Sequence, residues 1–116
     1  MNAITGQIVN ELRGRSTNGD RIERHVEYWP PSGRIVLRYV LETDTYYHQQ
    51  HHLTIAALAG TKWNPLATIA AQELQTFQPA PIPSPEAIEA DMRTAERIAA
   101  RLLGLTIARP MEYPEP

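Results

Sequence analysis

The chain has 116 residues, 42% hydrophobic and 21% charged, which is typical of one globular domain with a modest core. It contains no cysteine, which excludes disulfides, thiolate catalysis and cysteine-ligated metal centres. The formal net charge of −2 argues against a protein that binds nucleic acid over its whole surface. No apolar run approaches the length of about 20 residues that spans a bilayer, and the first residues lack the pattern of a signal peptide. We therefore expect residues 1–116 to form a single cytoplasmic domain.

The first segment, residues 2–13, carries Ile4, Ile8 and Leu12 at intervals of four, as on one face of a helix. The same residues also share the parity of one strand face, so a strand is the alternative. Gly14 follows as a typical helix stop, which favours the helix.

Two alternating segments then predict an antiparallel hairpin. In residues 21–29 and 34–42, apolar side chains fall on one face and charged side chains on the other. The Pro-Pro-Ser-Gly sequence at 30–33 between them is typical of a turn. Because an isolated hairpin is marginal in water, other elements must cover its apolar face.

The segment YYHQQHHL, residues 46–53, has two interpretations. Tyr46, Tyr47 and the β-branched residues that follow favour a strand, whereas the glutamines and the AALA sequence at 56–59 favour a helix. We expect a third strand from about residue 46, antiparallel to the second.

Two helices are predicted in the C-terminal half. Residues 65–77 follow Asn64, a good N-cap, and begin with proline, which suits the first helical position. Residues 85–103 follow Ser84 and show a long apolar stripe at helical spacing.

The remaining C-terminal segments are predicted to lack regular structure. Residues 79–84 form a proline-rich connector, and residues 105–116 form an extended tail. The predicted fold is therefore α+β, a small antiparallel sheet of two to four strands packed against two or three helices.

A row of arginines lies on the polar side of the helix predicted at 85–103. Arg93, Arg97 and Arg101 are four residues apart, and glutamates flank them in the sequence. Glu89 precedes Arg93 by four, the order that supports an ion pair on a helix. We interpret this row as a solvated face of mixed charge.

The histidines raise the question of a metal site. His48 and His52 have the spacing of the His-x-x-x-His pair in zinc proteases. Gln49 stands where those enzymes carry their catalytic glutamate, so that protease chemistry is excluded. We expect no resident metal or cofactor and no catalysis, with metal-dependent activity around His48 and His52 as an alternative.

A second alternative lies in residues 53–75. Ala56, Gly60, Leu66 and Ile69 have a spacing that resembles the helix-turn-helix of DNA-binding regulators. The resemblance implies a regulator whose second helix enters the major groove. However, Asn64-Pro65 falls near the start of that helix, and Lys62 is the sole basic residue nearby.

The leading hypothesis is a non-enzymatic protein-binding protein. We expect an inhibitor-like or accessory factor, of the kind found in phages and mobile elements, that occupies a surface of a larger protein or complex. Aromatic and arginine side chains anchor such interfaces. The expected partner-binding residues are Trp29, Arg34, Arg38, Tyr46, Tyr47 and His48.

Overall fold

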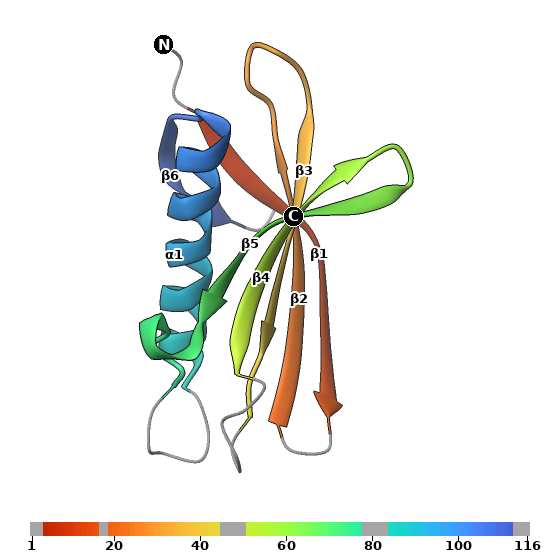
Figure 1. The fold of residues 1–116 in the computed structure, drawn as a ribbon. Helices are drawn as coiled ribbons and strands as arrows, with labels where there is room; N and C mark the ends of the chain where they lie inside the picture. Colours follow the sequence, from red (N-terminus) through yellow and green to blue (C-terminus); the bar gives the residue numbers. More distant parts are fainter. Residues whose placement is uncertain (1–3, 17–18, 45–50, 78–83, 113–116) are drawn as a thin grey trace.

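The described residues form one six-stranded sheet and one α-helix that packs against it (Figure 1). The elements are β1 (Ile4–Ser16), β2 (Gly19–Tyr28), β3 (Ile35–Glu42), β4 (His52–Ala59), β5 (Lys62–Ala70), the 3-10 turn η1 (Ala71–Glu73), α1 (Pro85–Leu103) and β6 (Ile107–Glu112). The computed structural model describes residues 4–16, 19–44, 51–77 and 84–112. The strand order is β5-β4-β3-β2-β1-β6. The first five strands form an antiparallel meander, and β6 pairs in parallel with β1.

Two of the predicted elements have the positions expected for them. The hairpin of 21–29 and 34–42 is present as β2 and β3, paired from Arg21↔Glu42 to Tyr28↔Ile35. The helix predicted at 85–103 is α1, and the hydroxyl of Ser84 accepts a hydrogen bond from the backbone N–H of Ala87 at 3.1 Å.

The predicted balance of helix and strand is wrong. Instead of two to four strands with two or three helices, the described residues have six strands and a single α-helix. The helix expected at 2–13 is strand β1. Spacing of four satisfies both a helix face and a strand face. A bulge between Ile8 and Asn10 then separates the apolar set, leaving Ile8 buried and Leu12 53% exposed.

The helix expected at 65–77 is also wrong, because this segment contains β5 and η1. Asn64 and Pro65, which were interpreted as a helix start, lie inside an edge strand. Proline is tolerated at a sheet edge because its missing N–H costs no ladder hydrogen bond there. The register shifts between Ile55 and Ala56 of the neighbouring strand, so that Ala56 pairs with Pro65.

The strand predicted from about residue 46 corresponds to β4, His52–Ala59, which is antiparallel to β3 as expected. Its predicted beginning lies outside the described residues, which omit 45–50. The AALA sequence at 56–59, which favours helix by propensity, is strand here. Pairing with β5 throughout, and with β3 at Ala56 and Ala57, overrides that weak preference.

Of the tail expected over 105–116, residues 113–116 lie outside the described residues, and most of the remainder is sheet. Residues 107–112 form β6, with Ile4 paired to Ile107. The backbone N–H of Ile4 also donates to the carbonyl oxygen of Thr106 at 2.8 Å.

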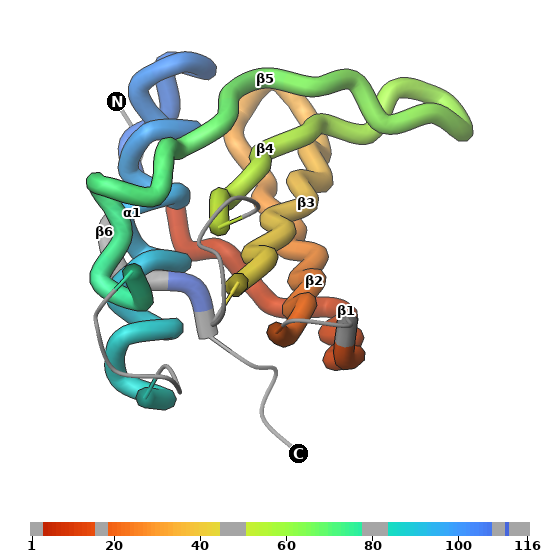
Figure 2. Tube along the Cα trace, turned by 60° about the horizontal axis from the view of Figure 1, so that its bottom comes forward, coloured from red at the N-terminus to blue at the C-terminus, as the bar shows by residue number. Residues whose placement is uncertain are grey.

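The core lies between α1 and one face of the sheet. Figures 1 and 2 place α1 beside β5 and β6, and α1 also contacts β3 and β4. None of the helices in the described ranges has the length and apolarity needed to cross a membrane. The fully buried apolar side chains are Val26, Tyr28, Leu37, Tyr39, Leu41, Leu53, Ile55, Met92, Ala95 and Ala99.

Two hairpin ends diverge from this core. The β2–β3 turn and the β4–β5 turn point in different directions (Figure 1). The ladder between β3 and β4 stops at Leu37↔Ala57. The ends of the two hairpins therefore extend separately from the sheet.

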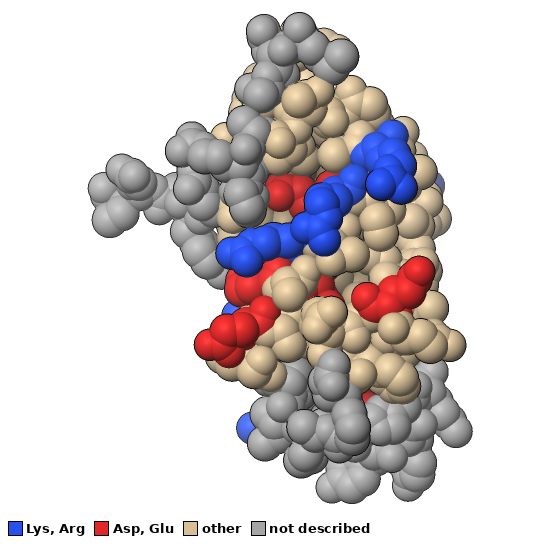
Figure 3. Space-filling model, turned by 90° about the vertical axis from the view of Figure 1, so that its left-hand side faces the viewer, with Lys and Arg blue, Asp and Glu red and all other residues tan. Residues whose placement is uncertain are grey.

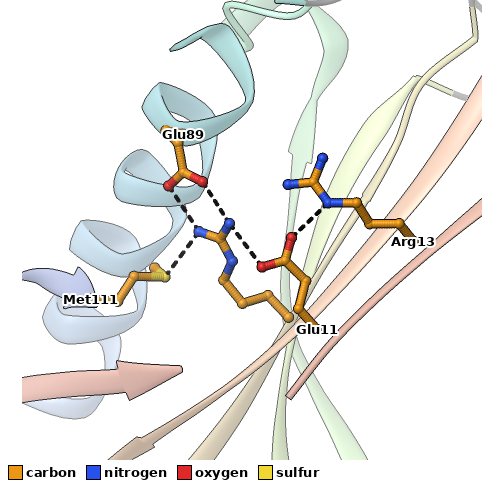
Figure 4. Close-up of polar contacts among 5 residues, drawn as sticks. Glu11, Arg13, Glu89 and Met111 are labelled. Carbon is orange, nitrogen blue, oxygen red and sulfur yellow. Dashed lines mark hydrogen bonds and ion pairs between the residues drawn. The ribbon is translucent and has the colours of Figure 1, made fainter. Parts of the chain in front are cut away.

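An arginine on the inner face docks the helix. Arg24 of β2 is fully buried, and its two terminal nitrogens donate to the Glu89 carboxylate at 2.6 and 3.0 Å (Figure 4). The same guanidinium lies 3.3 Å from Glu11 of β1 and contacts the sulfur of Met111 of β6 at 3.6 Å. One side chain thus joins four elements.

A second carboxylate of α1 fixes the segment that follows η1. Asp91, fully buried, accepts hydrogen bonds from the backbone N–H groups of Gln75 and Thr76 at 2.6 and 2.9 Å. A carboxylate is a strong acceptor for such N–H groups. This contact replaces the helical hydrogen bonds that were predicted for the same residues.

A third carboxylate, Glu96, lies in the core. It accepts hydrogen bonds from the Tyr28 hydroxyl at 2.8 Å and from the Met111 backbone N–H at 3.1 Å. The Tyr39 hydroxyl lies 2.7 Å from that of Tyr28. Burial raises the pKa of Glu96 above its usual range, although both hydrogen bonds oppose this shift.

Candidate protein-binding face

The sheet face turned away from α1, the outer face, carries a group of polar and aromatic side chains. The cross-strand register brings residues of four strands together on it. His25, Arg38 and Ala56 lie opposite one another on β2, β3 and β4. The outer face includes Arg21, Glu23, His25 and Glu27 of β2, Arg38 and Glu42 of β3, His52 and Thr54 of β4, and Trp63 of β5.

One anchor of this face stands at the end of the β2–β3 hairpin. Trp29 is 62% exposed, and its indole N–H donates to one oxygen of Glu27 at 2.8 Å. Arg34 donates to the other oxygen of Glu27 at 2.6 Å. Both hydrogen bonds lower the pKa of Glu27, and the one from Arg34 has the larger effect. The carboxylate therefore holds an exposed aromatic ring and a cation in defined positions.

A second anchor lies closer to the sheet centre. The Arg38 guanidinium lies over the Trp63 ring, 4.8 Å from its centroid. The His25 ring lies 5.1 Å from the same ring and is tilted by 56° to it. Both Arg38 and Trp63 are half-buried, and such a cation–π pair contributes about 1 kcal/mol. Packing thus limits the motion of these side chains before any partner arrives.

Charged side chains continue from this stack toward the other end of β2. Glu23 accepts hydrogen bonds from His25 at 2.6 Å and from Arg21 at 2.8 Å. Glu42 lies 3.8 Å from Arg21 and 3.9 Å from His52. Burial opposes the ionisation of Glu23, but its two hydrogen-bond partners lower its pKa overall. On the outer face, carboxylates therefore alternate with arginine and histidine side chains.

The structure brings together only part of the predicted partner-binding set. Trp29 and Arg34 meet at Glu27, and Arg38 lies on the same face in the second anchor. Tyr46, Tyr47 and His48 lie outside the described residues.

Of the two histidines considered as metal ligands, His48 and His52, the structure describes only His52. His48 is outside the described residues, while His52 is half-buried beside Glu42. Within the described ranges, no three His, Cys, Asp or Glu side chains form a group that could hold a metal ion. His51 is buried, where its Nε2 lies 2.7 Å from the Thr76 hydroxyl and its Nδ1 accepts from the Asp44 N–H at 3.3 Å.

The alternative of a helix-turn-helix over 53–75 is wrong. This segment forms β4, a tight turn, β5 and η1. Gly60 does make a turn, with φ of 63°, but it joins two strands instead of two helices. The segment therefore offers no recognition helix.

The predicted partner-binding residues did not include Glu27, His25 and Trp63, although the alternation placed Glu27 and His25 on this face. Glu27 and His25 alternate with the buried residues of β2, which was a usable signal. Trp63 was hidden because residues 65–77 were interpreted as a helix, so that its strand partner on β4 was not considered.

Comparison with protein-family models, with curated proteins and with solved structures finds no match to this chain.

Proposed function

We propose that the protein is a non-enzymatic, inhibitor-like or accessory factor that binds a larger protein through its outer face. The observation that carries this proposal is the exposed Trp29 ring, held by Glu27 beside Arg34. Aromatic and arginine side chains dominate the free energy of binding at protein interfaces. Side chains that are already ordered lose less conformational entropy on binding.

The second anchor supports the same function. Trp63, Arg38 and His25 offer an amphipathic surface on the same face. The matching partner surface has an apolar pocket for the indole of Trp29, with carboxylate or carbonyl oxygens nearby for the arginines. Such a partner would be released more readily at high salt, because exposed ion pairs are screened.

A quantitative capture experiment tests this function. Tagged wild-type protein, Trp29→Ala and Leu102→Ala are exposed to lysate of the organism that carries the gene, and captured proteins are quantified by mass spectrometry. Leu102 is the matched control, because it is 55% exposed but belongs to α1. We expect a specific protein whose capture falls at least about tenfold with Trp29→Ala, as for an interface hot spot, and is unchanged with Leu102→Ala.

The result that would contradict the proposal is equal capture by all three proteins. Circular dichroism melts of each variant show whether a loss reflects unfolding. Arg38→Ala provides a second test on the same face, and its effect should decrease as salt rises.

A further inference from the structure

The exposed side of α1 carries a second charged surface, the arginine row. It consists of Arg93, Arg97 and Arg101, which are all exposed and four residues apart. A rise of 1.5 Å per residue places successive members about 6 Å apart along the helix axis. Figure 3 shows lysine and arginine side chains as a continuous band across this side of the molecule.

Three of the carboxylates near this row in the sequence have hydrogen-bond partners on other elements. Glu89 pairs with Arg24, Asp91 accepts from two backbone N–H groups, and Glu96 is buried against Tyr28. None of the ion pairs among the described residues involves Arg93, Arg97 or Arg101. Asp91 and Glu96 are buried, whereas Glu86 is exposed and the Glu89 side chain is 39% exposed. The face is therefore mixed in charge, as predicted, and Figure 3 shows acidic side chains on both sides of the basic band.

A hollow of about 550 Å³ lies beside the N-terminal part of the row, at Arg93 and Arg97. Its lining includes Arg93 and Arg97, the small residues Ala87 and Ala90, and the exposed Gln75. Small side chains allow close approach of a backbone, and a glutamine amide can both donate and accept hydrogen bonds. Glu86 lines the same hollow and disfavours a further anionic group at that end.

We propose that this side of α1 binds an extended acidic peptide segment of a partner protein, with carboxylates on alternate residues. Side chains on one face of an extended chain repeat every 6.4–6.8 Å or so, since each residue rises about 3.2–3.4 Å. This repeat is close to the spacing of about 6 Å between the arginines. Each guanidinium then meets one carboxylate, while the peptide backbone lies over Ala87 and Ala90.

The geometry favours a peptide over a nucleic acid. Three cations supply few phosphate contacts, and phosphate contacts provide most of the affinity for nucleic acids. Single strands also require aromatic rings for base stacking, and the hollow has no aromatic residue among its described lining. The surface lies on α1, so it is independent of the outer face and its proposed partner.

Fluorescence anisotropy with defined probes tests the proposal. The probe is a labelled peptide with glutamate at every second residue, and a peptide of equal composition with contiguous glutamates is the control. Titrations at about 10 mM salt keep the screening length near 30 Å. We expect the alternating peptide to bind more tightly than the contiguous one. Arg93→Ala/Arg97→Ala should weaken it at least about tenfold, the sum of two charge-assisted contacts.

Arg34→Ala serves as the matched control, since it removes an exposed arginine from the outer face and should leave peptide binding unchanged. Equal affinity of the double variant and the wild type would overturn the proposal. So would tighter binding of a short oligothymidine, or no binding of the alternating peptide at low salt. The two proposals can fail separately. The Trp29→Ala capture experiment tests the outer face, and the peptide titration tests the arginine row.

Discussion

Arg24 and Glu89 are separated by 65 positions in the chain and joined by two hydrogen bonds of 2.6 and 3.0 Å. The guanidinium is fully buried, whereas the Glu89 side chain is 39% exposed. Glu11 and Met111 also contact the Arg24 guanidinium. The hydrogen bond from Arg24 is the largest cause of the lowered pKa of Glu89. This pair links β2 to α1 and is the centre of the contacts that position the helix.

Replacing Arg24 with alanine should destabilise the fold by about 3 kcal/mol. The substitution leaves the carboxylates of Glu89 and Glu11 without the positive charge that they face. Urea denaturation measures the free energy of unfolding. The matched control is Arg21→Ala, an exposed arginine on the same strand, which should cost less than about 1 kcal/mol. Equal losses in the two variants would show that Arg24 has no special role.

Asp91→Ala should release the backbone at Gln75 and Thr76. Both N–H groups lose a charged acceptor, at an expected cost of about 2–3 kcal/mol. Hydrogen exchange followed by NMR should show faster exchange at these two amides than at others of similar burial. Asp91→Asn keeps one acceptor oxygen and should lie between the wild type and alanine. Unchanged exchange at both amides would rule out this role.

Glu96 gives stability a pH dependence. Burial raises its pKa in the folded state above the usual value of 4.5. Between these two pKa values, the folded protein binds more protons than the unfolded chain. The free energy of unfolding contributed by Glu96 therefore decreases as pH rises from about 4.5 through the folded pKa. Glutamine cannot ionise. In denaturant titrations, the free energy of unfolding of Glu96→Gln should therefore increase relative to that of the wild type as pH rises across this range. A difference that does not change with pH would contradict it.

Gly6 allows β1 to approach Tyr28 closely. A Cβ atom at this position would collide with the Tyr28 ring and lie 2.8 Å from a methyl carbon of Val26. We therefore expect Gly6→Ala to lower the thermal midpoint, at a cost of about 1–3 kcal/mol for an overpacked core. Gly14 is the matched control on the same strand, because a Cβ atom there would meet no atom of the described residues within 4 Å. A loss with Gly14→Ala as large as that with Gly6→Ala would exclude this packing explanation.

The parts of the fold that could be predicted are those with strong local signals. The β2–β3 hairpin has clear alternation and a proline–glycine turn, and α1 has a cap, a long apolar stripe and Gly104 in the left-handed conformation at its end. The segment around Ile4 lacks such signals, and in the segment around Ile69 the Asn64-Pro65 pair, which is typical of a helix start, lies in a strand. Their apolar spacing suits helix and strand alike, and the outcome depends on pairing with distant strands, which local periodicity does not encode.

The candidate site shows the same division. Trp29 and Arg34 could be selected from residue type and from their place beside a turn. Glu27, which orients both of them, was not singled out because glutamates on an exposed strand are usually solvated. The partners of Glu89 and Asp91 could not be foreseen, since they are Arg24 and two backbone N–H groups elsewhere in the fold.

The pairing of β1 with β6 also governs the order in which the protein can be completed during synthesis. Ile4 and Ile107 are neighbours in the sheet although about 100 residues separate them, an interval that a ribosome needs about 5–20 s to translate. Until residues 107–112 emerge, β1 presents an open edge to other nascent chains, the kind of edge that promotes aggregation. Once paired, β6 covers the first residues of β1 and replaces a 13-residue edge strand there by one of 6 residues, and short edge strands are less prone to aggregation.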